Sequence, residues 1–297
     1  MARGTRARVR SNLTAYGFSA PYVALLLAFG ILPTAYAIYE SFADLQGGRC
    51  GFDLSNYISV VTDFRFWPAV GHVMTFLVIW IPVMLVGCLL FALLLHERAG
   101  RVSSGLRLVY FLPGAVTGSA AVLLWYFMLN PDLSPFAPML HAMGAQNTND
   151  VFTNGNLPFI FATLAFMTGV GSWIVIMYGA FQAIDLDVIE AARVDGAGPV
   201  RIALSIKLPL IAKYIVYMLI LCFAGAVQIF VEPSLFYGIT GAGSAWWSLN
   251  QLGYTFAFQQ GEFGQAATVS VILLVVSVVL ALLFVQRSRF FQTEADQ

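Results

Sequence analysis

Residues 70–94 read VGHVMTFLVIWIPVMLVGCLLFALL, a stretch that contains no Asp, Glu, Lys or Arg. About 20 apolar residues in a helix that rises about 1.5 Å per residue cross the hydrocarbon core of a membrane, so this stretch predicts a membrane-spanning helix. Five further runs have the same apolar character, at 17–39, 107–129, 158–182, 209–231 and 265–286. The runs are continuously apolar rather than alternating, which favours helices over a barrel. The predicted fold class is therefore all-α, a polytopic membrane protein with about six transmembrane helices.

The composition of the whole chain agrees with this interpretation. Of its 297 residues, 59% are hydrophobic and 10% are charged, whereas a soluble domain has about 25% charged residues. The net charge of zero gives no indication of a nucleic-acid partner. The three cysteines form no CxxC pair and the three histidines are far apart in the sequence, so we predict neither a disulfide framework nor a metal site.

The basic residues indicate how the chain is oriented. All 15 lysines and arginines except Arg49 and Arg65 lie in the N-terminal tail, the 95–107 stretch, the 193–213 stretch or the C-terminal tail. By the positive-inside rule, both termini are expected to be cytoplasmic in a multi-pass protein of the cell (inner or plasma) membrane. This predicts a cytoplasmic tail at 1–16, a transmembrane domain at 17–286 with a cytoplasmic loop at 183–208, and a cytoplasmic tail at 287–297. The first apolar run is too long for a signal-peptide core, so it is expected to be a retained span.

Two patterns narrow the class of protein. No charged residue lies near the centre of any predicted span, which disfavours proton-driven carriers and voltage sensors. The sequence also lacks the GxxxxGK[ST] phosphate-binding loop, so any ATP hydrolysis would come from another polypeptide. We therefore expect no catalytic residues, no metal ligands and no cofactor in this chain.

The cytoplasmic loop between spans four and five has strong local signals. Residues 183–208 read AIDLDVIEAARVDGAGPVRIALSIKL. Asp187 followed by Glu190 predicts the start of a short helix. Gly196 suits the left-handed conformation that ends a helix, and Gly198-Pro199 suits the start of a second one.

Two further expectations concern the edges of this loop. Ile189, Ala192 and Val194 are expected to form the apolar side of the first short helix. Leu208-Pro209 is expected to open span five, where the missing N–H of proline costs little. The loop is thus predicted to be a compact pair of short helices rather than a flexible linker.

The same loop resembles the signature of a known family. Glu190-Ala191-Ala192, Gly196, Ile206 and Leu208-Pro209 match every fixed position of the "EAA" signature of binding-protein-dependent ABC importer permeases. In that family the loop forms a coupling helix that docks on a separate ATPase subunit. The resemblance implies an ATPase-coupling site that consists of Glu190, Ala191, Ala192, Arg193, Asp195, Gly196, Ile206, Leu208 and Pro209. Glu190 alternatively only caps the helix, and Arg193 alternatively serves only the positive-inside bias.

The resemblance extends over nearly the whole chain. Residues 20–42, 52–57, 64–67, 111–113 and 125–131 look like segments of the carbohydrate-uptake branch, the maltose and glycerol-phosphate type. Gly71-His72-Val73 stands where the family commonly has Asn-Thr, and Asp185 stands where it commonly has Pro. These departures leave the subgroup open.

The resemblance implies a sugar or a sugar-like polyol such as glycerol phosphate as cargo. It also implies a second permease subunit of different sequence, two ATPase subunits that hold ATP and Mg²⁺, and an extracytoplasmic solute-binding protein. Lipid surrounds the chain, and no nucleic acid is expected.

Aromatic and hydrogen-bonding side chains bind sugars, so polar and aromatic residues in the spans are candidates for the substrate path. These candidates are Trp125, Thr168, Ser172, Trp173, Tyr217, Gln228 and Glu232. The alternative for most of them is interhelical packing or the interfacial aromatic belt. For Glu232 the alternative is contact with water.

Two other classes of protein stay open at this point. One is an ion-coupled secondary transporter that needs no ATPase. The other is a non-transporting membrane protein, such as an assembly or sensory subunit.

Overall fold

The computed structural model describes residue 16 and residues 18–44, 49–97, 100–116 and 118–287. The predicted tails at 1–16 and 287–297 lie outside the described residues, apart from Tyr16 and Arg287. Among the described residues, the long apolar helices are Phe18–Phe42, α4 (Phe66–Glu97), α9 (Leu157–Gln182), Ala212–Thr240 and α16 (Phe263–Arg287). The first contains the π-helical turn η1 (Leu27–Ile31) and α2 (Leu32–Phe42), and the fourth contains α13 (Ala212–Val227) and α14 (Val231–Thr240).

Each of these helices is long and apolar enough to cross a membrane, and a bent helix pair gives a sixth candidate. Lipid offers no hydrogen-bond partners to the backbone, whereas a helix pairs its own N–H and C=O groups. Continuous apolar runs in a membrane therefore fold as helices. The prediction of an all-α, multi-span membrane protein is confirmed. The small exception among the described residues is an antiparallel ribbon of β1 (Ala43–Asp44) and β2 (Arg49–Phe52).

The third predicted span, at 107–129, is broken. Here α5 (Arg101–Phe111) and the short 3-10 turn η2 (Leu112–Ala115) are followed by α6 (Gly118–Leu129), and the two parts meet at 101°. Pro113 lacks a backbone N–H and Gly118 has a φ of +60°, so neither residue continues a regular α-helix.

A close helix crossing accompanies this break. A Cβ atom on Gly171 of α9 would lie 2.1 Å from the backbone oxygen of Tyr110, and a Cβ atom on Gly114 would lie 2.7 Å from that of Thr168. Only glycine fits at such distances. The two glycines therefore let the broken third span lie directly against α9.

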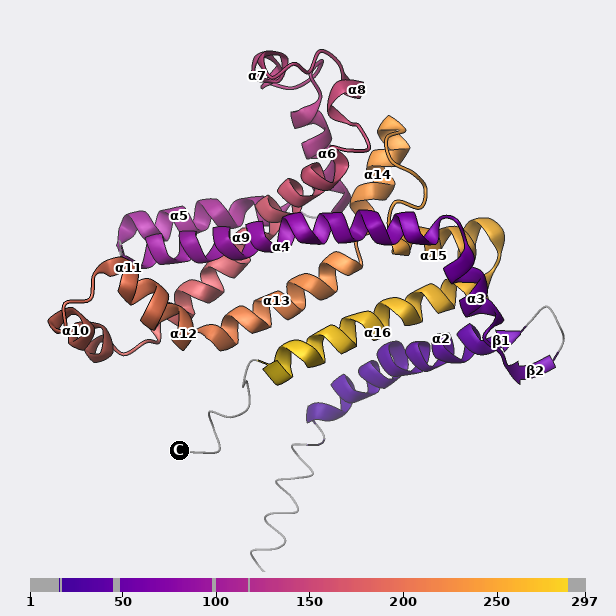
Figure 1. The fold of residues 1–297 in the computed structure, drawn as a ribbon, viewed down its shortest axis with the longest axis horizontal. Helices are drawn as coiled ribbons and strands as arrows, with labels where there is room; N and C mark the ends of the chain where they lie inside the picture. Colours follow the sequence, from indigo (N-terminus) through magenta and orange to yellow (C-terminus); the bar gives the residue numbers. More distant parts are fainter. Residues whose placement is uncertain (1–15, 17, 45–48, 98–99, 117, 288–297) are drawn as a thin grey trace, which may run out of the picture.

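The long helices run side by side, with different segments at their two ends (Figure 1). α4 packs against α9, and α16 packs against both α2 and α13. The short helices α10 and α11 lie at one end of the bundle, and α3 (Ser55–Thr62) and α15 (Leu249–Tyr254) lie at the other. α6 and α14 pack together and, with α7 (Ala137–Ala142) and α8 (Thr148–Val151), form an arm on one side.

Candidate functional site

The loop between α9 and α13 contains two short helical segments. α10 (Leu186–Val194) is followed by α11 (Pro199–Ile202), the π-helical turn η3 (Ala203–Lys207) and α12 (Leu208–Leu210). We call residues 183–211 the α10–α12 loop. Figure 1 places it at the end of the bundle opposite α3 and α15.

The start of α10 differs from the sequence prediction. The N-cap is Asp185, whose side chain accepts a hydrogen bond from the backbone N–H of Asp187 at 3.1 Å. Asp187 itself lies in the first turn. The predicted box from Asp187 to Glu190 is therefore wrong, because the helix starts two residues earlier, where Asp185 has the extended backbone of a cap.

The sides of α10 also differ in part from the prediction. Ile189 is buried and Ala192 is half-buried, as expected, but Val194 is 87% exposed. Glu190, Ala191, Arg193 and Asp195 are exposed. The signature residues of α10 are thus largely accessible from outside the chain.

The end of α10 follows the prediction. Gly196 has a φ of +81°, and the backbone N–H groups of Gly196 and Ala197 donate to the carbonyls of Arg193 and Ala192 at 3.0 and 2.9 Å. This pattern satisfies carbonyl groups that the end of the helix leaves free. Since no atom lies within 4 Å of a Cβ built on Gly196, the requirement for glycine here is one of backbone conformation and not of space.

The second part of the loop begins as predicted and ends differently. Pro199 is the first residue of α11, after Gly198 in an extended conformation. Pro209 does not open span five, because it lies in α12, and α13 begins only at Ala212 after a break at Ile211. Ile206 and Leu208 are half-buried, whereas Pro209 is exposed.

A buried lysine attaches this loop to the spans. Lys207 is the last residue of η3, and its side chain is 4% exposed. Its Nζ forms an ion pair with the carboxylate of Glu97 at the end of α4 and lies 3.3 Å from Nδ1 of His96. The His96 ring in turn contacts the rings of Tyr178 and Phe181 in α9. The sequence analysis did not identify this contact, and its only local signal was a charged residue between the apolar Ile206 and Leu208.

The predicted substrate-path residues do not form one cluster. Trp173 and Tyr217 meet edge to face, with 6.1 Å between ring centroids. The Thr168 hydroxyl donates to the Leu164 carbonyl of its own helix at 2.9 Å, and Ser172 is exposed. Trp125 lies in α6 and Glu232 in the first turn of α14, which are the two helices that pack in the arm.

Gln228 lies beside a groove at the end of the bundle opposite α10. An open groove of about 480 Å³ lies between α2, α16 and the segment formed by α15 and the π-helical turn η4 (Thr255–Gln260). A neighbouring groove of about 300 Å³ shares Asn250 with it and includes Gln228. The Asn250 amide donates to the backbone oxygen of Gln228 at 2.7 Å. We call the larger space the outer groove.

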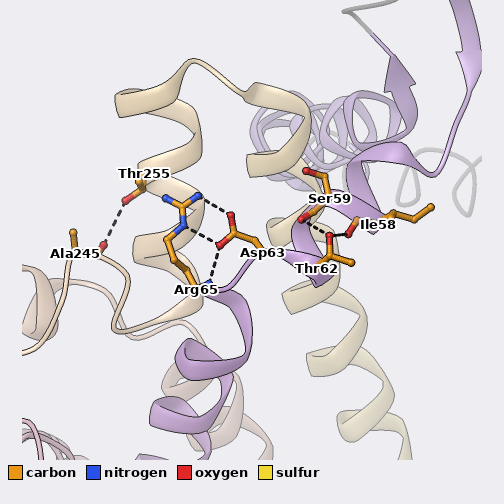
Figure 2. Close-up of polar contacts among 7 residues, drawn as sticks. All are labelled: Ile58, Ser59, Thr62, Asp63, Arg65, Ala245 and Thr255. Carbon is orange, nitrogen blue, oxygen red and sulfur yellow. Dashed lines mark hydrogen bonds and ion pairs between the residues drawn. The ribbon is translucent and has the colours of Figure 1, made fainter.

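An ion pair lies in the turn between α3 and α4 (Figure 2). The Arg65 side chain donates from Nε and Nη2 to the two carboxylate oxygens of Asp63 at 2.9 and 2.8 Å. The guanidinium also lies over the ring of Phe256, 5.0 Å from its centroid. Hydrogen bonds from Arg65 lower the pKa of Asp63 below its usual value, and those same bonds raise the pKa of Arg65.

No set of three or more His, Cys, Asp or Glu side chains comes together as a metal site in the part of the chain that the structure describes. The functional candidates are therefore one exposed loop at one end and one groove at the other.

The comparisons with known proteins cover nearly the whole chain. Residues 63–290 match the family described as "Binding-protein-dependent transport system inner membrane component". The sn-glycerol-3-phosphate transport system permease protein UgpA of Brucella suis is 29% identical over 91% of this chain and 92% of its own length. The trehalose/maltose transport system permease protein MalF of Thermococcus litoralis is 26% identical over 96% of this chain and 97% of its own length.

Solved structures share the fold. A chain of a bacterial ABC transporter involved in the import of alginate matches with a TM-score of 0.79 at 17% identity, over 97% of this chain and 99% of that one. A chain of the alginate transporter in complex with its pentasaccharide-bound periplasmic protein matches with a TM-score of 0.80 at 16% identity, over 97% and 98%. The family resemblance inferred from the loop sequence is confirmed, and the chain belongs to the binding-protein-dependent transport system inner membrane components, the permease subunits of ABC importers.

Proposed function

We propose that this chain forms half of the translocation pathway for a sugar or sugar-like solute and that a separate ATPase, which binds α10, drives the transport. The observation that carries the proposal is the EAA-type sequence Glu190-Ala191-Ala192 on a short, capped and exposed helix. An exposed helix that is already folded loses less conformational entropy when it binds a partner than a flexible segment would.

The contacts of Lys207 support a mechanical role for the loop. Closing of the ATPase moves α10, and the continuous helical segment from Pro199 to Leu210 carries this movement to Lys207. The ion pair with Glu97 then passes the displacement to α4. Coupling requires that the ATPase contact α10 differently in its open and closed states, because only differential contact shifts a conformational equilibrium.

The distribution of basic residues supports one orientation of the chain in the membrane. The α10–α12 loop and both termini face the cytoplasm, where the ATPase lies. The outer groove then lies on the extracytoplasmic side, where a solute-binding protein delivers its cargo. Lys207, Arg193 and Arg201 all belong to the cytoplasmic side in this arrangement.

The relatives support the choice of cargo and partners. They are named as permeases for glycerol 3-phosphate, for trehalose and maltose, and for arabinooligosaccharides. A sugar or sugar-like solute is the class that fits them all. The importer would contain this chain, a second permease of different sequence and two ATPase subunits that bind ATP and Mg²⁺, together with the binding protein.

The secondary transporter and the non-transporting membrane protein, which the sequence left open, have less support than the ABC importer permease. An ion-coupled secondary transporter would need no EAA-type loop, and a sensory or assembly subunit would need no pathway. Neither class is favoured by a feature of the described residues.

Gly196 and Gly198 offer a matched test of the coupling role. Gly196→Val forces a β-branched residue into the left-handed conformation, whereas Gly198 has a φ of −71° and open space around it, so Gly198→Val is tolerated. We expect Gly196→Val to weaken ATPase co-purification and to lower ATP-dependent solute uptake by about tenfold or more, given a backbone cost of about 1–2 kcal/mol and a distorted docking surface. Normal co-purification and normal uptake in Gly196→Val would overturn the assignment.

A further inference from the structure

Glu40 is a carboxylate in a membrane-spanning helix that lines the outer groove. We propose that the outer groove binds an uncharged carbohydrate and that Glu40 makes it reject anionic solutes. This inference rests on the proposed function, which places the groove on the side where the solute arrives. It narrows the cargo from sugars in general, including phosphorylated ones, to neutral sugars.

The size and walls of the groove fit a small saccharide. Its volume of about 480 Å³ lies within the range of about 300–1,000 Å³ found for small-molecule sites. Phe230, Tyr254 and Phe258 form a row along it, with 5.6 and 4.9 Å between successive ring centroids. Tyr254 and Phe258 are 46% and 73% exposed, so their apolar faces are available to the C–H surface of a sugar ring.

Polar groups in the groove match hydroxyl groups rather than charges. Glu40 is 8% exposed and interacts with the Tyr36 hydroxyl. Asn250 and Ser270 also line the groove. A carboxylate accepts hydrogen bonds from sugar hydroxyls but repels a phosphate or a second carboxylate.

The surroundings of the groove reinforce this selection. The segments assigned to the extracytoplasmic side contain two arginines, Arg49 and Arg65. They contain eight carboxylates: Glu40, Asp44, Asp53, Asp63, Asp132, Asp150, Glu232 and Glu262. The Arg65 guanidinium, which lies over Phe256 in η4, is already bound to both oxygens of Asp63 (Figure 2). An anionic solute would therefore approach a side of the bundle that is negative in total charge.

Charge-dependent labelling of the groove tests the proposal in the complete importer. Ser270 is exposed and lines the groove, so Ser270→Cys, combined with Cys50→Ser, introduces a thiol there. Cys88 and Cys222 are buried. In nanodiscs, the cationic thiol reagent MTSET should react about tenfold faster than the anionic reagent MTSES, beyond their ratio on a free thiol, because the Glu40 carboxylate lines the same groove. High salt should reduce this preference.

Two variants and a set of competing solutes serve as controls for the labelling experiment. Glu40→Gln should remove most of the preference for MTSET, whereas Asp53→Asn, which neutralises an exposed carboxylate near the end of α2, should leave it. Should Glu40→Gln fail to fold, the reagent preference and its salt dependence in the Ser270→Cys protein still decide the matter. At millimolar concentration, glucose, maltose and trehalose serve as neutral probes, with glucuronate and glycerol 3-phosphate as anionic ones.

We expect at least one neutral saccharide to slow the labelling and neither anion to do so. Lack of reaction with both reagents would mean that lipid or a second permease fills the groove, and would overturn the proposal. Equal corrected rates, protection by no neutral saccharide, or stronger protection by an anion would also overturn it. The Gly196→Val experiment is independent of these rates, so failure of the coupling role and failure of the groove assignment remain distinguishable.

Discussion

The α10–α12 loop and the outer groove lie at opposite ends of the helical bundle, and the chain specifies them in different ways. The loop comes from consecutive residues that carry their own start and stop signals, such as Asp185, Gly196 and Pro199. The groove is assembled from α2 in the N-terminal part of the chain and from the consecutive elements α15, η4 and α16 in its C-terminal part. The loop proposed to bind the ATPase is thus encoded locally, whereas the groove proposed to bind a solute depends on packing between remote elements.

The largest expected effect concerns the ion pair between Lys207 of the loop and Glu97 of α4. Glu97→Gln leaves the charge of Lys207 buried with His96 as its remaining neighbour, and we expect a loss of up to about 3 kcal/mol in the free energy of unfolding. Lys207→Met leaves Glu97 unpaired, but the Glu97 side chain is 48% exposed and water solvates it. That variant should therefore lose less than about 1 kcal/mol.

Denaturant unfolding of the purified variants in one detergent measures this asymmetry. Equal losses in the free energy of unfolding of both variants would show that burial of Lys207 does not determine how much the Lys207–Glu97 ion pair stabilises the protein. Lys207→Met should still lower ATP-dependent uptake, since it detaches the loop from α4.

The second prediction tests how far the contact between α3 and α16 depends on tertiary fit. A Cβ atom on Gly264 of α16 would lie 2.7 Å from the amide nitrogen of Asn56, which donates to the backbone oxygens of Ser41 and Ala43 at 3.3 and 3.1 Å. Gly264→Ala displaces this amide, and we expect a loss of about 1–2 kcal/mol. Thermal unfolding of the purified protein measures it.

Gly238→Ala is the matched control for this variant. Gly238 lies in α14 with no atom within 4 Å of a built Cβ, so alanine there should be neutral or slightly stabilising. A loss in Gly238→Ala as large as in Gly264→Ala would show that close contact at Asn56 is not the cause.

The third prediction concerns the local signals of the loop. Asp185→Ala removes the side-chain acceptor at the start of α10 and should destabilise this helix by about 1 kcal/mol. Asp187→Ala removes only a charge in the first turn, which is worth a few tenths of that, about 0.3 kcal/mol. Hydrogen exchange over residues 186–194 measures both, and faster exchange in Asp187→Ala than in Asp185→Ala would contradict the observed cap.

The smallest effect is the pH dependence of the ion pair between Asp63 and Arg65. Because Arg65 lowers the pKa of Asp63, the ion pair stabilises the folded protein above the unfolded pKa of about 3.9. This stabilisation is lost as the pH falls through the lower, folded-state pKa, since the unfolded state then binds the proton first. The difference in melting temperature between the unsubstituted protein and Asp63→Asn should be constant from pH 7 to 5 and shrink below about pH 4. A difference that grows on acidification would contradict this.

The sequence predicted the elements whose cause is local. Continuous apolar runs gave the spans, because length and hydropathy alone decide whether a helix crosses lipid. Gly196 and Pro199 marked the ends of short helices through backbone conformations that belong to those residues. The EAA-type pattern identified the family because it combines fixed residues at fixed spacing.

Features with a remote cause were missed. The broken third span lies directly against α9 because Gly114 and Gly171 approach neighbouring backbone closely, and no hydropathy pattern reveals this contact. Val194 was placed on the wrong side of α10, since its side chain faces away from the bundle. The groove brings Glu40 together with Asn250, and only the packing of α2, α15 and α16 creates that neighbourhood.

The π-helical turn Ala203–Lys207 has a geometric consequence for the α10–α12 loop. A π-helical turn contains one residue more than an α-helical turn needs, and each residue rotates a helix by about 100°. Both kinds of turn complete about one rotation, so the π-helical turn absorbs its extra residue without rotating α11 relative to α12. Deleting Ser205 would therefore regularise this segment and leave that relative orientation nearly unchanged, whereas deleting a residue from a regular α-helical turn would rotate the flanking parts by roughly 100°.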